Sequence, residues 1–83
     1  QAEKWLMGKG FHQVRVRVQG LGAKIELPAE TIESLIREPT RKQVVNYFLS
    51  IGFTSISIDL EGFISGKLNR DRNIDSKTLR NRN

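Results

Sequence analysis

Cysteine is absent from this 83-residue sequence, and histidine occurs only once. Without cysteine the chain cannot form disulfides, thiolate zinc sites or a cysteine nucleophile. A single histidine also argues against a histidine-based metal site. The absence of cysteine is typical of a cytoplasmic protein, and we expect that location.

Long hydrophobic runs are also missing. Hydrophobic residues make up 37% of the chain, but no stretch of them is long enough to cross a membrane. The first ten residues, QAEKWLMGKG, lack the charged start and the apolar stretch of a signal peptide. We therefore expect no membrane partner. The length corresponds to one domain with a small core.

The net charge of +5 invites a nucleic-acid interpretation, but most of the charge lies at one end. The segment 67–83, KLNRDRNIDSKTLRNRN, holds six Lys/Arg and two Asp, which is +4 of the total. Because it is poor in apolar residues, we predict a basic, disordered tail. The preceding residues, 1–66, are predicted to form a single α+β domain that is close to neutral.

The stretch VRVRV alternates three valines with Arg15 and Arg17. Strict alternation is typical of a half-buried strand, because successive side chains point to opposite faces. It predicts a strand at about 13–19, with the valines in the core and both guanidiniums on the other face. Those arginines could be solubilising, a nucleic-acid contact or two forks for an anionic ligand, and the pattern leaves these interpretations open.

The flanking stretches predict a helix and a hairpin. Residues 2–8 resemble a helix that is ended by glycines. GLG at 20–22 is a tight turn, and AKIEL at 23–27 alternates like a second strand. Pro28 suits the first turn of the next helix. The apolar face expected for that helix consists of Ile32, Leu35 and Ile36.

Two further elements are predicted after this helix. Pro39 breaks it, and Thr40 with Gln43 predicts a capping box for another helix, which Gly52 closes. TSISIDL at 54–60 predicts a third strand. The side chains expected to be buried are Val44, Val45, Phe48 and Leu49 in the helix and Ile56, Ile58 and Leu60 in the strand.

An internal repeat organises these elements. WLMGKGFHQVRVRV at 5–18 aligns with YFLSIGFTSISIDL at 47–60, an offset of 42 residues. In both copies a helix ends at glycine, a phenylalanine enters the core and a strand follows. The predicted fold is α+β, in the order α-β-β-α-α-β with an αβ pseudo-repeat: a small sheet of about three strands has helices on one face. The other face is predicted to carry Arg15, Arg17, Lys24, Glu26, Ser57 and Asp59.

The stretch DLEGFISGKLN, which begins at Asp59, has two interpretations. Ser65 and the backbone amides near Gly66 could hold an anion. The other interpretation is an ordinary glycine-containing loop, which the spacing alone favours. Asp59 and Glu61 could be taken for a catalytic dyad, but structural pairing with Arg17 is the preferred hypothesis.

Three ordered blocks resemble the C-terminal portion of one family: GFHQVRVR (10–17), AKIEL (23–27) and IDLEGFISGKLN (58–69). They are similar to the PP-loop ATP pyrophosphatases of the LarE type (ExsB-like). The pattern of that family is G-F-x-x-V-R-V-R, then A-R-I-E-hydrophobic, then L-D-L-E-G-aromatic-x-S-G-x-L-N. Its members are ATP-dependent sacrificial sulfur transferases that help to make the nickel-pincer nucleotide cofactor of lactate racemase. The match covers roughly residues 1–69.

The resemblance implies part of an enzyme, either a C-terminal domain or a stand-alone remnant. The family's ATP site is an N-terminal Ser-Gly-Gly-x-Asp-Ser loop, and nothing in this sequence resembles it. The sulfur-donor cysteine of some members is also missing. The implied role is therefore on the substrate side and in subunit assembly, without catalysis by this chain alone. No cofactor is expected here, and ATP and Mg²⁺ only with an N-terminal PP-loop domain. That domain or other copies of the chain are the expected partners.

The resemblance also implies an anionic pocket. The family's substrate is a pyridinium dicarboxylate mononucleotide activated by adenylylation, so a mononucleotide-type anionic ligand is expected. The residues carried over from the family are Glu3, Arg15, Arg17 and Glu26, and none is assigned as catalytic or metal-binding. Two guanidiniums on one strand face offer bidentate forks for phosphate or carboxylate, and Glu26 on the next strand can orient one of them.

The alternative hypothesis is a small stand-alone module that binds nucleic acid or a partner protein. The basic tail would supply charge, and the sheet would supply a platform. However, sheet-face RNA readers stack bases on exposed aromatic side chains, and the polar positions of this predicted sheet hold none. Nucleic acid is therefore the disfavoured partner.

Overall fold

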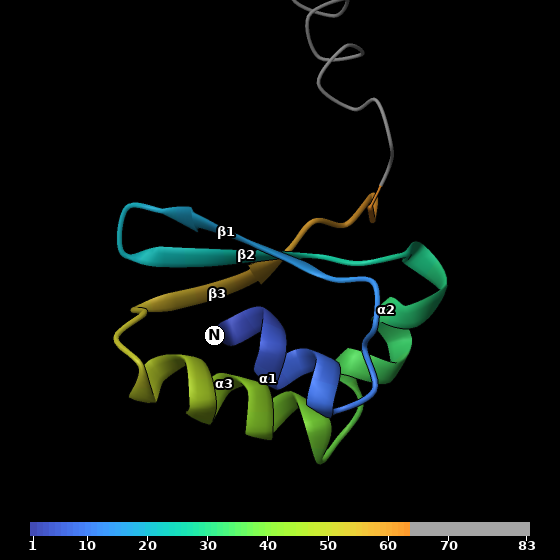
Figure 1. Cartoon of the computed structure of the whole chain (residues 1–83), viewed down its shortest axis with the longest axis horizontal. Helices are drawn as coiled ribbons and strands as arrows, with labels where there is room; N and C mark the ends of the chain where they lie inside the picture. Colours follow the sequence, from blue (N-terminus) through green and yellow to red (C-terminus); the bar gives the residue numbers. More distant parts are fainter. Residues whose placement is uncertain (64–83) are drawn as a thin grey trace, which may run out of the picture.

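The computed structural model of the chain describes residues 1–63. The predicted tail at 67–83 and the loop residues Ser65 and Gly66 lie outside the described residues. The elements are α1 (Ala2–Gly8), β1 (Arg15–Gln19), β2 (Gly22–Glu26), α2 (Ala29–Ile36), α3 (Thr40–Ser50) and β3 (Ser55–Ile58). All three helices lie on one side of the sheet (Figure 1). The predicted α+β class and element order are confirmed.

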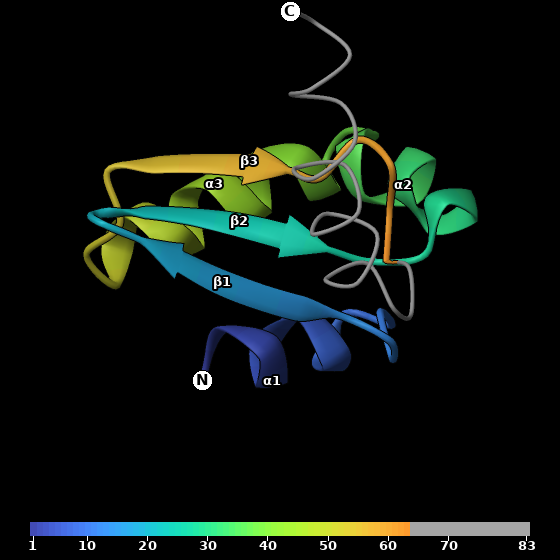
Figure 2. The same ribbon diagram turned by 90° about the horizontal axis from the view of Figure 1, so that it is seen from above.

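The sheet is mixed and has the order β1-β2-β3. β1 pairs antiparallel with β2, and β2 pairs parallel with β3, so β1 and β3 run in opposite directions at the two edges. The β1–β2 hairpin has a two-residue loop that begins at Gly20, whose φ is +59°. Glycine at this position is typical of tight hairpin turns. Seen from above, α1 lies along the β1 side of the sheet and α3 along the β3 side (Figure 2).

The predicted repeat is present in the backbone. The first αβ unit is α1–β1 and the second is α3–β3. Each helix is followed by a glycine with a positive φ, +107° at Gly10 and +110° at Gly52. The phenylalanine after that glycine donates its N–H to a carbonyl five residues back, at 3.1 Å in both units. These pairs are Phe11 with Leu6 and Phe53 with Phe48.

Equivalent residues of the two αβ units meet where the helices touch. Trp5 of α1 stacks on Tyr47 of α3, with ring centroids 4.3 Å apart and planes 3° from parallel. Each is the repeat counterpart of the other. Together with the opposite directions of β1 and β3, this contact indicates that the two αβ units are related by an approximate two-fold axis.

The core lies between the sheet and the helices. Side chains from the inner face of the sheet meet those of all three helices, and each large one that is fully buried contributes about 1.5–3 kcal/mol. The buried residues are Leu6, Val14, Ala23, Ile25, Leu27, Leu35, Val44 and Phe48. Trp5, Phe11, Tyr47 and Phe53 pack against this cluster and are partly buried.

Four side chains that the periodicity places in the core are exposed, and one of them is Val18 of β1, at 68%. Leu60 is 88% exposed, because β3 ends at Ile58 and the inward alternation ends with it. Ile36 and Leu49 are 49% and 48% exposed. Both lie in the last turn of their helices, where the chain leads away from the sheet and the apolar face of the helix no longer packs against the core.

The predicted capping box is wrong. Pro39 occupies the N-cap position of α3, so Thr40 is already the first helical residue and no side chain caps the helix. The Gln43 side chain instead accepts a hydrogen bond from Lys9 Nζ at 3.1 Å. Pro28 likewise lies at the N-cap of α2 rather than in its first turn. Within residues 1–63, no helix has the length and apolar character needed to span a membrane.

Candidate anion-binding face

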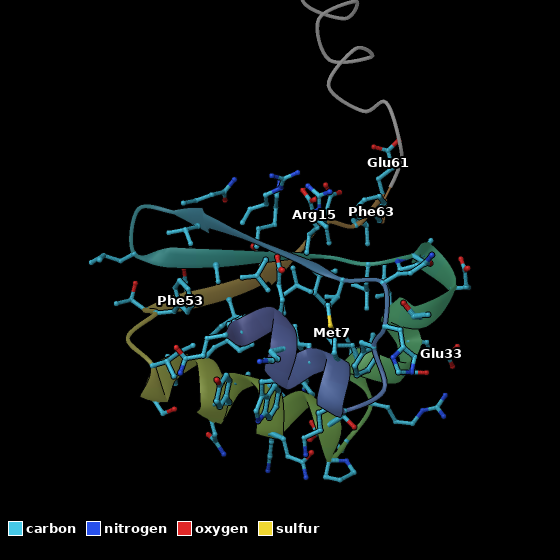
Figure 3. The ribbon with its side chains drawn as sticks, viewed as in Figure 1. Met7, Arg15, Glu33, Phe53, Glu61 and Phe63 are labelled. Carbon is cyan, nitrogen blue, oxygen red and sulfur yellow. The ribbon has the colours of Figure 1, made fainter. Side chains whose placement is uncertain are left out.

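The polar face is the side of the sheet opposite the helices, and it gathers the predicted outward side chains. The register places Arg15 opposite Glu26 and Arg17 opposite Lys24 across the β1–β2 pair. Lys24 is also level with Ser57 of β3. Because successive strand residues alternate, these side chains project to the same side. Arg15 and Phe63 lie on this side in Figure 3.

A chain of ion pairs crosses the three strands on the polar face. Arg17 Nε lies 3.3 Å from Glu26 Oε1, and Lys24 Nζ lies 3.9 Å from Glu26 Oε2. Lys24 Nζ also lies 3.8 Å from Asp59 Oδ2. The two carboxylate side chains are only 12% and 11% exposed, so screening by water is weaker than for an open surface pair. The predicted pairing of Glu26 with one strand arginine is confirmed.

The predicted pairing of Asp59 with Arg17 is wrong. Asp59 forms an ion pair with Lys24, while Arg17 pairs with Glu26. The reason is the register, since Lys24 of β2 lies between β1 and β3 and reaches the carboxylate first. The backbone N–H of Glu61 donates to Asp59 Oδ1 at 3.1 Å, so this carboxylate also holds the turn that follows β3.

Arg15 differs from Arg17 in its surroundings. Among residues 1–63, no carboxylate lies within 4.0 Å of the Arg15 guanidinium. Its Cζ lies 5.4 Å from the centroid of the Phe63 ring, a cation–π contact. Such a contact at an exposed site contributes about 0.5–1 kcal/mol and leaves the N–H donors available.

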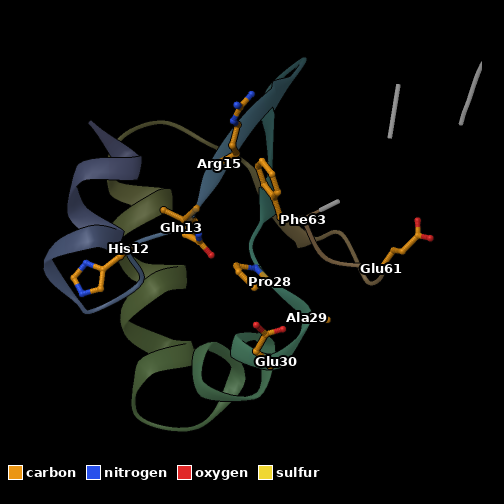
Figure 4. Close-up of a pocket in the computed structure, with 9 residues that line it drawn as sticks. His12, Gln13, Arg15, Pro28, Ala29, Glu30, Glu61 and Phe63 are labelled. Atoms are coloured by element: carbon orange, nitrogen blue, oxygen red, sulfur yellow. The ribbon is translucent and has the colours of Figure 1, made fainter. Parts of the chain in front are cut away.

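A hollow of about 530 Å³ opens beside Arg15 (Figure 4). Its volume lies within the usual range of small-molecule sites, about 300–1,000 Å³. The Arg15 guanidinium and the Phe63 ring lie at one end, and Glu30 lies at the other. The hollow therefore combines a cation, an aromatic ring and carboxylates. Its polar lining comes from His12, Gln13, Arg15, Glu30 and Glu61.

Glu3 lies apart from the other three carried-over residues. It is in the first turn of α1, and its Oε2 accepts a hydrogen bond of 2.9 Å from the Val16 backbone N–H. Val16 belongs to an edge strand, so this bond satisfies an outward-pointing donor. The structure thus brings Arg15, Arg17 and Glu26 together and gives Glu3 a structural contact. Its predicted place in a substrate pocket stays a prediction.

Comparison with known proteins supports the resemblance in the three sequence blocks. No protein-family model matches the chain. An uncharacterized protein of Synechocystis sp. is 43% identical over 70 residues, which are 84% of this chain and 26% of that protein. The pyridinium-3,5-bisthiocarboxylic acid mononucleotide synthase of Lactiplantibacillus plantarum is 41% identical over 68 residues, 82% of this chain and 24% of the enzyme. This chain resembles a LarE-type enzyme. It spans about a quarter of the length of both relatives.

Sequence reasoning missed part of the lining of the hollow. His12 and Gln13 precede β1, and Glu30 is in the first turn of α2. No spacing or motif marks them, because they meet only when the hairpin places the start of β1 beside α2.

The predicted lack of aromatic side chains on the polar face is confirmed for the strands. Within residues 1–63 the strands carry no aromatic residue on this face, and Phe63 borders it from the segment after β3.

Proposed function

We propose that this chain is the C-terminal, substrate-side and assembly region of a PP-loop ATP pyrophosphatase that resembles the sulfur transferases of nickel-pincer cofactor synthesis. The similarity to a mononucleotide synthase over 82% of the chain supports this proposal. In it, ATP and Mg²⁺ are bound by a PP-loop domain outside this sequence. This chain contributes binding and does not catalyse alone.

The proposal depends most on the surroundings of Arg15. Arg15 lies at the edge of the hollow, and no carboxylate among residues 1–63 forms an ion pair with it. A guanidinium with available donors binds phosphate or carboxylate by charge-assisted hydrogen bonds, which contribute about 1.5–3 kcal/mol. In the proposed site, Arg15 binds the phosphate or a ring carboxylate of a mononucleotide.

The mixed charge of the hollow also fits such a ligand. A pyridinium mononucleotide has a positively charged ring as well as anionic groups. With the anionic group at Arg15, the ring can approach the carboxylate of Glu30, at the other end of the hollow. A purely anionic ligand such as RNA would meet repulsion from this carboxylate.

Titration with nicotinic acid mononucleotide tests this proposal, because this probe combines a pyridinium ring, a carboxylate and a phosphate. We expect Arg15→Ala to weaken binding to the full chain by about 10–100-fold, the equivalent of one charge-assisted contact. Arg41→Ala is the matched control, since Arg41 is on α3 and pairs with Glu38. Isothermal titration calorimetry measures both. Equal affinities for Arg15→Ala and the unmodified chain would contradict the proposal.

A further inference from the structure

The two arginines of β1 have unequal partners, and the strand register makes this unexpected. Arg15 lies directly opposite Glu26. Side chains directly opposite in an antiparallel pair have Cβ atoms about 4.5–5.5 Å apart, so Arg15–Glu26 would be the nearest ion pair. The structure shows the diagonal pair instead, with Glu26 bound to Arg17 at 3.3 Å.

Lys24 accounts for this choice of partner. Its ammonium lies between two carboxylates, 3.9 Å from Glu26 and 3.8 Å from Asp59. One oxygen of Glu26 is thereby next to Lys24 and the other next to Arg17. Both contacts lie on the side of Glu26 away from Arg15, because Lys24 and Arg17 are level with each other one step along the strands.

This part of the polar face has one more cation than carboxylates. Arg15, Arg17 and Lys24 face two carboxylates, those of Glu26 and Asp59. Both carboxylates are taken up by the other two cations, and Arg15 contacts the Phe63 ring. Arg15 is also the cation of this group that lines the hollow.

We propose that Lys24 is a positioning residue: by bridging Glu26 and Asp59 it holds Glu26 on Arg17 and away from Arg15, so that Arg15 alone binds the anionic group of the ligand. This inference rests on the proposed mononucleotide-binding function. It divides the two arginines, with Arg15 contacting ligand and Arg17 fixing Glu26. Lys24 itself acts through Glu26 and does not touch the ligand.

A merely structural role for Lys24 makes a different prediction. Lys24→Met keeps most of the side-chain stem, which packs on the sheet, and removes only the ammonium. With a positioning role, Glu26 is then released to Arg15 and competes with the ligand. The second change Glu26→Gln removes this competing charge and restores binding. If Lys24 only stabilised the fold, the second change would restore nothing.

The experiment compares the unmodified chain, Lys24→Met and Lys24→Met/Glu26→Gln by NMR and by titration with nicotinic acid mononucleotide. Without ligand, we expect the Arg15 Nε–Hε signal to shift, and its exchange with water to slow, only in Lys24→Met. With ligand, we expect binding about 5–20-fold weaker in Lys24→Met and within about threefold of the unmodified chain in the double variant. The backbone amide spectrum reports whether each variant is folded.

Each result decides one of the two proposals. An unchanged Arg15 signal in Lys24→Met, or a double variant as weak as the single one, overturns the positioning role. An unmodified chain that does not bind the probe contradicts the proposed function, while the Arg15 signal still tests the position of Glu26.

If Lys24→Met does not fold, Glu26→Gln alone tests the inference. In that variant Arg17 loses its carboxylate partner and can bind the ligand, so we expect the affinity to rise at least about threefold. A loss of affinity in that variant would overturn the inference.

Discussion

The two αβ units have nearly the same backbone at the junction of helix and strand. Gly10 and Gly52 differ by 3° in φ. Yet β1 carries Arg15 and Arg17 on the polar face, where the repeat aligns Ser57 and Asp59. The apolar residues and glycines set the scaffold in both units, whereas the outward positions are free to differ. We therefore expect the α1–β1 unit to contact the ligand and the α3–β3 unit to position the residues that do so.

A second difference between the units concerns the sheet edges. In the first unit, Glu3 accepts a hydrogen bond from the Val16 N–H on the edge of β1. Glu3 precedes the repeat, and the same offset of 42 residues leads to Val45 of α3, whose side chain has no acceptor group. The same architecture thus has one edge satisfied by a carboxylate of its own helix and one edge without that contact. The predictions that follow test how deep the equivalence of the two units goes.

The largest effects are expected at the core pair Leu6 and Phe48, which are repeat counterparts and fully buried. Phe48→Ala should lower the free energy of unfolding by about 3–5 kcal/mol and Leu6→Ala by about 2–5 kcal/mol. Since an 83-residue chain has roughly 4–12 kcal/mol in total, either change should remove a large share of its stability. Urea denaturation followed by circular dichroism measures this. A loss below about 1 kcal/mol at one site would show that the units are not equivalent in the core.

Next in size are the paired glycines. Alanine at Gly10 or Gly52 has space for its Cβ but must adopt a positive φ. Both changes should therefore cost about 1–2 kcal/mol, and the two costs should agree. Gly8→Ala is the control, because Gly8 is helical, has no neighbour within 4 Å of the added Cβ and gains helix propensity. Thermal unfolding of the three variants compares them, and a neutral Gly52→Ala would break the comparison.

The edge contact should have a smaller effect. Glu3→Ala leaves the Val16 N–H without its carboxylate acceptor and should cost about 1 kcal/mol. Hydrogen exchange at the Val16 amide should accelerate at the same time. Glu33→Ala is the control, since Glu33 is 78% exposed and pairs with Arg37 at the C-cap of its own helix. No change in Val16 exchange would contradict a structural role for Glu3.

The smallest effects are expected at the ends of the two apolar strand patterns. Val18 and Leu60 are repeat counterparts and are 68% and 88% exposed. Val18→Thr and Leu60→Ser should each change the free energy of unfolding by less than about 0.5 kcal/mol. Urea denaturation is again the measurement. A large loss at Leu60 would show that it is covered in solution and that the strand pattern extends further than β3.

Much of the fold could be predicted because its signals are local. Alternating valines and isoleucines marked the strands, and the glycines before Phe11 and Phe53 marked the helix ends. The errors lie at the ends of helices and strands, whose exact boundaries the local pattern does not fix. Thr40 resembled a cap only because the position of Pro39 at the N-cap could not be read from spacing.

The candidate site was predictable only in part. Alternation alone placed Arg15, Arg17 and Glu26 on one face, and the structure agrees. Which arginine pairs with Glu26 depends on strand register and on the competing ammonium of Lys24, and neither is visible in the sequence. The lining residues His12 and Gln13 come from the connection before β1. His12 and Gln13 line the hollow because tertiary packing brings this connection next to α2, and no local motif predicts that packing.

Binding of nicotinic acid mononucleotide by Arg15→Ala and by Ser57→Ala tests the central claim most directly. The repeat aligns these residues, and both lie on the polar face, but only Arg15 lines the hollow. The Ser57 hydroxyl contacts the Ala23 carbonyl instead, at 3.4 Å. We predict a loss of about 10-fold or more for Arg15→Ala and a change within about twofold for Ser57→Ala. Equal effects at the two positions would contradict the assignment of binding to the first αβ unit.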